Sequence, residues 1–149
     1  MALVDLITEK IVKVPLESRD KPGVLRELVQ ILKDAGEIDD FDKVLLAINK
    51  REEMGSTGLE FGIAVPHART DSVKNLTVAL GISPGGTEFN ALDGKPSHLF
   101  FLLLAPPDKS AQHIEALAEI AKLARSRSFC LQLMQANSAQ QVVELFREE

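Results

Sequence analysis

The sequence contains neither Trp nor Tyr, so any aromatic packing depends on its seven Phe residues. Its single cysteine, Cys130, excludes a disulfide within the chain and a zinc site made of several cysteines. Acidic residues outnumber basic ones and the net charge is −5. This balance argues against nucleic acid as a partner, because phosphate backbones are bound by clustered Lys and Arg.

Long hydrophobic runs are absent as well. The longest, from Leu99 to Ala105, has the length of a strand and falls far short of the roughly 20 apolar residues that span a bilayer. The N-terminus has no apolar segment with basic flanks, so we expect no signal peptide. Together these absences predict a cytoplasmic protein that does not insert into a membrane.

Four apolar segments before residue 105 predict strands, at residues 11–14, 63–65, 77–82 and 99–104. The last of them is apolar on both faces, so we expect it at the centre of a sheet with both sides covered. The tripeptide Pro84-Gly85-Gly86 is expected to break the chain after the segment 77–82.

Two helices are predicted between the first and second of these segments. Asp20 can cap a helix that ends at Gly36, and Asp39 or Asp40 can cap another that runs to about Arg51. Because apolar residues recur along one stripe of each helix, we expect the pair to pack together against the sheet.

The C-terminal third is predicted to be helical. Ser110 or Asp108 can cap a first helix, a shorter one follows Ser126, and Ser138–Gln141 is a capping-box pattern for the last. Strands in the middle with helices before and after them predict an α/β fold, a three-layer α/β/α sandwich with a central mixed β-sheet flanked by helices. No repeat or linker interrupts the chain, so we expect a single domain over residues 1–149.

One histidine stands at the end of a predicted strand. The run 63–65 is stopped by Pro66, which lacks an N–H, and His67 follows directly. A neutral imidazole held at a rigid strand end is a good nucleophile near neutral pH. The alternative for an isolated pattern of this kind is a surface histidine after a turn.

Other residues could act together with His67 on an anion. Arg51 ends a predicted helix just before a loop that contains Ser56 and Thr57, and His113 lies near the start of the helix after the central strand. Basic side chains and free backbone N–H groups are what a transferred phosphoryl group requires, because its catalysis is mostly positioning and charge stabilisation. Taken alone, Arg51 and His113 would each be interpreted as exposed helix-end residues.

The segment from Arg51 to His67 contains Arg-Glu, then Ser-Thr-Gly-Leu, then Gly-Ile-Ala-Val-Pro-His. It resembles the active-site signature of the IIA component of the bacterial phosphoenolpyruvate-dependent sugar phosphotransferase system. The type is that of fructose and mannitol, which includes the nitrogen-regulatory IIA proteins. The resemblance extends over nearly the whole chain, since the helix pair, the segment 90–96, the strand before Pro106 and the region from His113 onward follow in the family's order.

The resemblance implies a role for each site residue. His67 would accept the phosphoryl group from phospho-HPr on Nε2, Arg51 would contact that group, and His113 would stabilise it without carrying it. Ser56 and Thr57 fall in the loop that would lend backbone or hydroxyl donors. The phosphoryl group would then pass to a separate IIB-type protein for carbohydrate uptake, with no cofactor and no metal.

The sequence also departs from the family pattern. Glu60-Phe61 stands where the family often has Gly-Asn, and Ala68 stands where Gly is commoner. A carboxylate at position 60 that pointed at the site would repel phosphate, whereas one that pointed into solvent or to the donor protein would not.

Two further hypotheses belong to other functional classes. One is a regulatory module, of the nitrogen-regulatory type, in which the phosphorylation state of His67 controls binding to a transporter, kinase or transcription factor. The other is a domain that keeps the fold without the chemistry, as in the cytosolic domains of anion exchangers. The presence of His67, Arg51 and His113 together argues against this last hypothesis.

Overall fold

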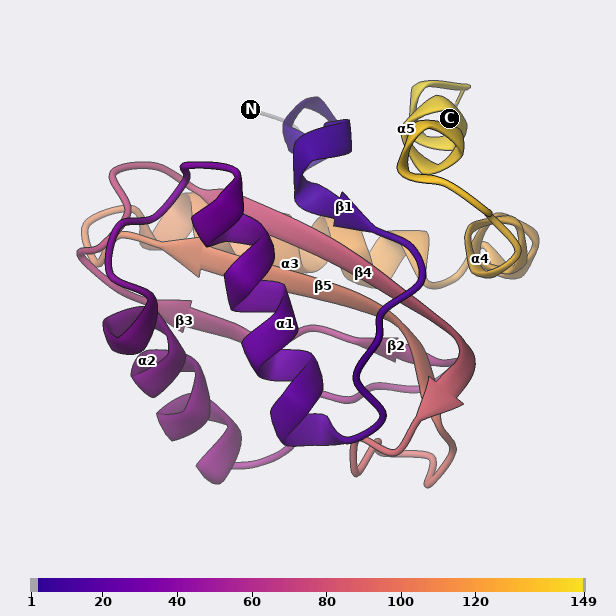
Figure 1. Ribbon diagram of the computed structural model, residues 1–149, viewed down its shortest axis with the longest axis horizontal. Coiled ribbons are helices and arrows are strands. Elements are labelled where there is room, and N and C mark those ends of the chain that lie inside the picture. Colours follow the sequence, from indigo (N-terminus) through magenta and orange to yellow (C-terminus); the bar gives the residue numbers. More distant parts are fainter. Residues whose placement is uncertain (1–2, 149) are drawn as a thin grey trace.

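The computed structural model describes residues 3–148, and a five-stranded mixed sheet forms its middle layer. Helices cover both faces of this sheet, so the predicted three-layer α/β/α arrangement is confirmed (Figure 1). The strands are β1 (Val12–Lys13), β2 (Ile63–Ala64), β3 (His67–Arg69), β4 (Thr77–Thr87) and β5 (Ser97–Ala105).

Two long helices lie on one face and a third lies behind the other (Figure 1). The first pair is α1 (Lys21–Asp34) and α2 (Phe41–Glu53), and the third is α3 (Ser110–Leu123). Short 3-10 helices η1 (Leu3–Leu6) and η2 (Glu9–Ile11) precede β1, and the chain continues after α3 through α4 (Arg127–Met134) and α5 (Ala139–Glu148).

The strand order is β1-β4-β5-β2, and β3 also pairs with β5. Strands β4 and β5 are antiparallel and the other pairs are parallel. Residues Leu99 to Ala105 of β5 are fully buried, as expected for a central strand that is apolar on both faces.

Proline divides the edge of the sheet next to β5 into two short strands. β2 ends at Ala64 and β3 begins at His67, with Val65 and Pro66 between them. Pro66 has no N–H to donate to the ladder, but its carbonyl accepts the N–H of Leu103 at 2.9 Å. The strand therefore stops near the proline as predicted, but His67 opens a second strand, which pairs with β5.

Several predicted helix ends are confirmed. The Asp20 side chain accepts the N–H of Gly23 at 2.8 Å, and that of Asp40 accepts the N–H of Lys43 at 3.0 Å. Gly36 has a φ of 75° directly after the first helix, a left-handed conformation that glycine adopts without steric cost. Ser138 caps α5 by accepting the Gln141 N–H at 3.1 Å.

Two predicted features were wrong. The N-cap of α3 is Lys109, and Ser110 is its first helical residue, with its hydroxyl donating to the Pro107 carbonyl. The strand β4 continues through Pro84-Gly85-Gly86 to Thr87, with a shift of register between Ile82 and Thr87. Gly86 permits this because a side chain there would lie 2.9 Å from the Pro96 Cβ, and its φ is 82°.

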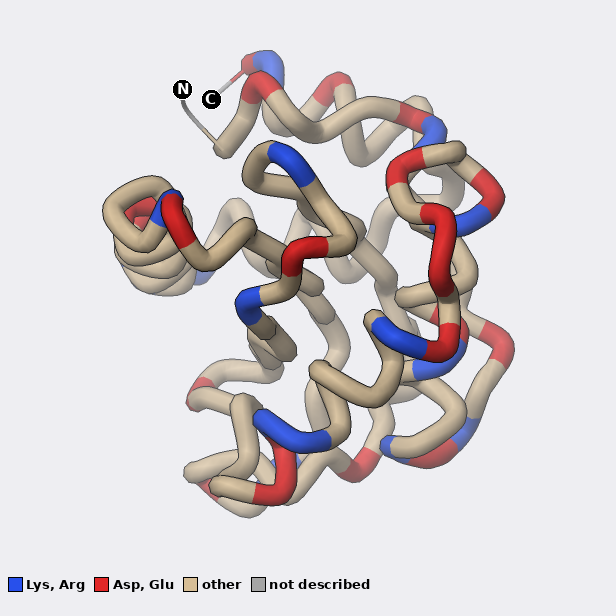
Figure 2. The backbone as a smooth tube through the Cα atoms, turned by 90° about the vertical axis from the view of Figure 1, so that its left-hand side faces the viewer, with Lys and Arg blue, Asp and Glu red and all other residues tan. Residues whose placement is uncertain are grey.

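Acidic and basic residues are interspersed along the backbone on the side shown in Figure 2, without a large region of one sign. Within residues 3–148, none of the helices has the length and hydrophobicity needed to cross a membrane.

Candidate functional site

Three predicted site residues line one hollow at the edge of the sheet. Arg51 lies in the last turn of α2, His67 opens β3, and His113 lies in the first turn of α3. β3 packs against α2, and α3 packs against the adjacent β5. These contacts bring together residues that are far apart in the sequence. The hollow is also lined by Ala47, Lys50, Met54, Ala68, Arg69, Ile114 and Leu117.

The orientation of the His67 ring is set by its own backbone. Nδ1 lies 2.7 Å from the Val65 carbonyl oxygen. Because a carbonyl can only accept, Nδ1 must carry the proton in this contact. The neutral ring then keeps its lone pair on Nε2, which makes Nε2 the nucleophilic nitrogen.

The second histidine lies directly beside the first. The rings of His67 and His113 meet edge to face, with centroids 5.2 Å apart and planes inclined by 74°. His113 is only 4% exposed, and its Nε2 has no hydrogen-bond partner among the described residues. A buried nitrogen without a partner is costly, so the site has an unused hydrogen-bonding position next to His67.

The pKa values of both histidines lie below the ordinary value. For His67 the main cause is burial, and the nearby Arg51 charge acts in the same direction, against the Val65 hydrogen bond. Burial is also the main cause for His113, with smaller effects from His67 and Arg69. Both rings are therefore kept neutral to lower pH than an ordinary histidine, which preserves the lone pair that a nucleophile needs.

These lowered pKa values predict a loss of stability in acid. Above the ordinary pKa near 6.5, folded and unfolded chains are both neutral at these rings and the full stability is present. As pH falls below that value, the unfolded chain binds protons first, so the free energy of unfolding decreases until the pH passes the folded-state pKa values.

Urea unfolding at about pH 7.5 and about pH 5.5 measures this loss. His113→Ala is expected to lose less stability between the two pH values than the wild type, because one of the two linked groups is gone. Protonation of carboxylates lowers the stability of both proteins equally, so it cancels when their two losses are compared. Equal losses would show that His113 is not held neutral by the fold.

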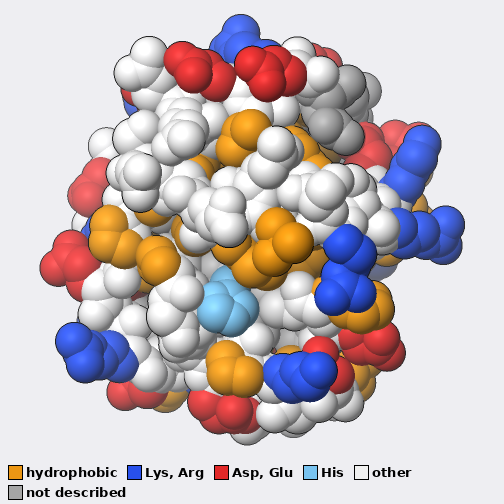
Figure 3. Space-filling model, turned by 90° about the vertical axis from the view of Figure 1, so that its right-hand side faces the viewer, with side chains coloured by type: hydrophobic (Ala, Val, Ile, Leu, Met, Phe, Trp, Pro, Cys, Tyr) orange, Lys and Arg blue, Asp and Glu red, His pale blue; other side chains and the backbone are white. Residues whose placement is uncertain are grey.

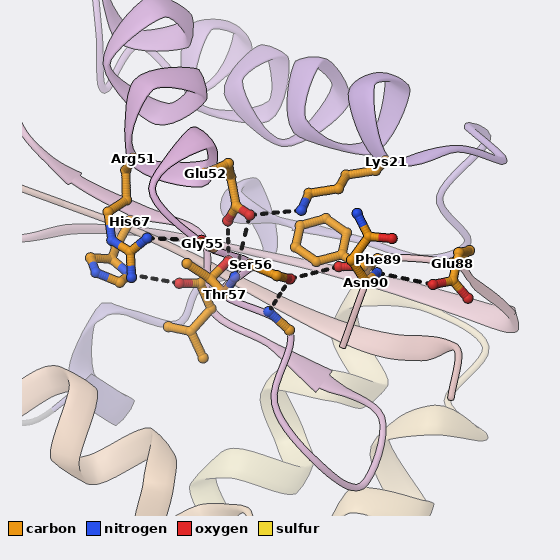
Figure 4. Close-up of polar contacts among 12 residues, drawn as sticks. Lys21, Arg51, Glu52, Gly55, Ser56, Thr57, His67, Glu88, Phe89 and Asn90 are labelled. Carbon is orange, nitrogen blue, oxygen red and sulfur yellow. Dashed lines mark hydrogen bonds and ion pairs between the residues drawn. The ribbon is translucent and has the colours of Figure 1, made fainter. Parts of the chain in front are cut away.

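Arg51 is already directed to the loop that follows α2. Its Nη1 donates to the Gly55 carbonyl at 2.9 Å, and the side chain lies next to His67 in the hollow (Figure 4). A guanidinium carries five N–H donors in a planar fork. The contact with Gly55 therefore leaves further donors for an anion on His67.

Ser56 and Thr57 lie in that loop, but their hydroxyls are engaged elsewhere. The Ser56 hydroxyl donates to the Phe89 carbonyl at 2.7 Å and accepts the N–H of Gly58 at 3.0 Å. The Thr57 hydroxyl donates to the Glu52 carboxylate. In this structure both side chains build the loop and do not offer their hydroxyl protons to the hollow (Figure 4).

Glu60 does not line the hollow that contains His67. Glu60 instead lines a different hollow, together with Gly62, Lys95, His98 and Arg127. Figure 3 shows the side of the molecule where β2 and β5 begin, on which hydrophobic, histidine and basic side chains lie close together. The carboxylate at position 60 therefore lies outside the lining of the His67 hollow.

Phe61 adopts a φ of 63°. The Arg127 guanidinium lies over its ring, with the guanidinium carbon 4.1 Å from the centroid of the Phe61 ring. Asn adopts this left-handed conformation far more readily than Phe. The departure from the family pattern at this position therefore strains the backbone, but it lies outside the hollow.

Sequence reasoning missed a partly buried ion pair behind the loop. Lys21 Nζ lies 2.9 Å from a Glu52 carboxylate oxygen, and the two side chains are 18% and 6% exposed. Glu52 belongs to the quoted motif, but the sequence contains no signal that pairs it with a lysine at the start of the preceding helix.

Cys130 is buried beside Phe129 and Leu133, and burial raises the pKa of its thiol. It is therefore a packed core thiol. Within residues 3–148, no group of three or more His, Cys, Asp or Glu side chains could hold a metal ion.

The sequence matches the family model described as phosphoenolpyruvate-dependent sugar phosphotransferase system, EIIA 2, over residues 5–149. It is 35% identical over 148 residues to the PTS system fructose-specific EIIABC component of Bacillus subtilis, covering 99% of this chain but 23% of that protein. It is 36% identical over 128 residues to the PTS system fructose-specific EIIA component of Haloferax volcanii, covering 86% of this chain and 83% of that protein.

Among solved structures, the crystal structure of nitrogen regulatory protein IIA-Ntr from Neisseria meningitidis superposes with a TM-score of 0.88. It is 29% identical in sequence, and the match covers 97% of this chain and 98% of that one. Fold and sequence thus define an α/β component of the phosphotransferase system. The chain belongs to the EIIA 2 family.

Proposed function

We propose that the protein is a phosphoryl carrier that accepts a phosphoryl group from phospho-HPr on Nε2 of His67 and passes it to a IIB-type partner for carbohydrate uptake. The observation that carries this proposal is the hydrogen bond from Nδ1 of His67 to the Val65 carbonyl. It leaves the Nε2 lone pair available on a ring that lines the same hollow as Arg51 and His113. The similarity to two fructose-specific proteins supports the carbohydrate role.

The transfer balances without any cofactor. The Nε2 lone pair attacks phosphorus on the phosphohistidine of the donor, and the new N–P bond forms as the donor's P–N bond breaks. The electron pair of the broken bond returns to the donor imidazole. Nδ1 of His67 keeps its proton, and the Val65 carbonyl stabilises the positive charge that develops on the ring.

The other two residues act on the phosphoryl oxygens. Charge spreads over three equatorial oxygens in such a transition state, so positioned donors supply most of the catalysis. Arg51 provides the guanidinium, and Nε2 of His113 gains from a phosphoryl oxygen the partner that it lacks among the described residues.

Incubation with phosphoenolpyruvate, enzyme I and HPr tests the proposal by intact mass. We expect a gain of one phosphate that is stable in base and lost in acid, as a phosphohistidine is. If HPr becomes phosphorylated and this protein does not, the carrier function is wrong.

A second candidate function is supported by the similarity to IIA-Ntr. In it, the phosphorylation state of His67 controls binding to a transporter, kinase or transcription factor. The fate of the phosphate separates the two functions. A carrier transfers it to a IIB-type protein within the assay, whereas a regulator retains it and changes which protein it binds.

His113→Ala is expected to accept phosphate at least roughly tenfold more slowly than the wild type, because one stabilising donor is lost while the nucleophile remains. Phosphorylation time courses by intact mass measure this rate. The control is His98→Asn, since Asn can still donate to the Ser83 carbonyl that His98 contacts at 3.0 Å. A wild-type rate in His113→Ala would remove His113 from the site.

A further inference from the structure

The partly buried ion pair between Lys21 and Glu52 has no role in the transfer described above, and neither residue lines the hollow with His67. Removing two charges from water is expensive, so a pair of this kind adds little to stability unless its geometry is well satisfied. The role of the pair is therefore better inferred from the groups that it holds in place than from its contribution to stability.

The Glu52 carboxylate makes further contacts with the loop. One of its oxygens accepts the Thr57 hydroxyl, and the other accepts the Thr57 N–H at 3.3 Å. Thr57 is 4% exposed. The carboxylate thus joins the first residue of α1, the last turn of α2 and the loop at a single point (Figure 4).

From Thr57 the connection continues to the histidine through a single residue, Val65. The Thr57 carbonyl accepts the N–H of Val65 at 3.0 Å, and the Val65 carbonyl accepts Nδ1–H of His67 at 2.7 Å. The loop at Thr57 runs alongside the segment before Pro66. An isolated antiparallel β-bridge between Gly58 and Ala64 is a further link between them. A shift of Thr57 would therefore move the carbonyl that selects the tautomer of His67.

We propose that Lys21 and Glu52 are positioning residues for the phosphoryl site, which act through Thr57 and Val65 to hold His67 with its lone pair on Nε2. Glu52 directly follows Arg51 in the last turn of α2, so the same anchor also sets the position of the guanidinium. The catalytic part of this inference rests on the proposed phosphoryl transfer at His67, whereas the control of the tautomer does not.

Electrostatics agrees with this placement. The Glu52 carboxylate acts to raise the pKa of His67, against the effect of Arg51. Its charge is therefore felt at the nucleophile although the two side chains share no hydrogen bond among the described residues.

The test uses two variants that break the connection at different points. Glu52→Gln keeps the side-chain length but leaves Lys21 without its anion, and Thr57→Val keeps the shape but removes the hydroxyl. Nitrogen NMR of the unphosphorylated protein reports the tautomer of His67. The time course of phosphorylation by phospho-HPr reports the rate.

We expect both variants to show an increased fraction of the tautomer with the proton on Nε2. The rate of phosphate acceptance is expected to fall roughly tenfold to hundredfold, as it does when reacting groups are misplaced by about 1 Å. Glu53→Gln is the matched control, because it removes the same charge from the adjacent, exposed residue of α2. Thr57→Ser, which keeps the hydroxyl, is expected to restore the wild-type tautomer.

Folding is monitored by thermal denaturation. If Glu52→Gln does not fold, the double variant Lys21→Met/Glu52→Gln avoids leaving the partly buried Lys21 charge unpaired. Folded variants with the tautomer and rate of the wild type would overturn the proposal. A changed tautomer in a protein whose wild type accepts no phosphate would support the positioning role and reject the proposed function.

Discussion

His67→Ala is expected to abolish phosphate acceptance from phospho-HPr while the protein stays folded. The substitution removes Nε2, the nitrogen whose lone pair is left free by the contact of Nδ1 with the Val65 carbonyl. The fold is expected to survive because the pairing of His67 with Leu103 in β5 uses backbone groups and not the imidazole. Intact mass after incubation with phosphoenolpyruvate, enzyme I and HPr measures the loss.

The control for this variant is His98→Asn. It removes a different imidazole, that of His98 on β5, and is expected to gain one phosphate like the wild type. Thermal denaturation of both variants separates loss of the nucleophile from loss of the fold. Acid-labile phosphate on folded His67→Ala would place the acceptor on another residue and contradict the proposed carrier mechanism.

Arg51→Ala is expected to have the second largest effect, a decrease of roughly 100-fold to 1000-fold in the rate of phosphate acceptance, as when a preorganised donor to a developing charge is removed. Arg51→Lys is expected to recover part of this rate, because Lys supplies the charge without the planar fork of donors. Time courses of phosphorylation, quenched at intervals and run with saturating phospho-HPr, measure the rates of the variants and the wild type.

Lys122→Ala is a suitable control, because Lys122 is an exposed cation in the last turn of α3, just as Arg51 is a cation in the last turn of α2. A rate close to that of the wild type is expected for it. If Arg51→Ala and Lys122→Ala slow the reaction equally, the effect of Arg51 is one of overall charge and not of contact with the phosphoryl group.

Much of the fold could be predicted because its signals are local. Asp20 and Asp40 cap helices through their own nearby N–H groups, and the segment 99–104 is apolar on both faces, which only a central strand satisfies. Pro66 ends a strand because of its missing N–H, wherever that strand lies in the sheet.

The course of β4 and the partners of the loop hydroxyls depended on neighbours that are distant in the sequence. The strand β4 passes through Pro84-Gly85-Gly86 because its pairing with β5 resumes at Thr87 and Ser97. Ser56 and Thr57 lie in the loop that was predicted to lend backbone or hydroxyl donors, a prediction that stays open for the backbone groups, and their hydroxyls bond to Phe89 and Glu52. Which acceptor a hydroxyl finds is decided by the packing of other elements and not by its own segment.

The sequence alone determined which chemical groups are available, an imidazole after a proline-ended strand and a guanidinium at a helix end, because these features follow from residue type and local backbone geometry. Only the tertiary structure decided how they are used. The carbonyl of Val65 selects which nitrogen of His67 keeps its lone pair, His113 is buried against that ring, and Lys21 meets Glu52 behind the loop. Each of these contacts joins residues whose distance is set by the packing of helices on the sheet or by the exact course of the backbone, and neither can be read from local preferences.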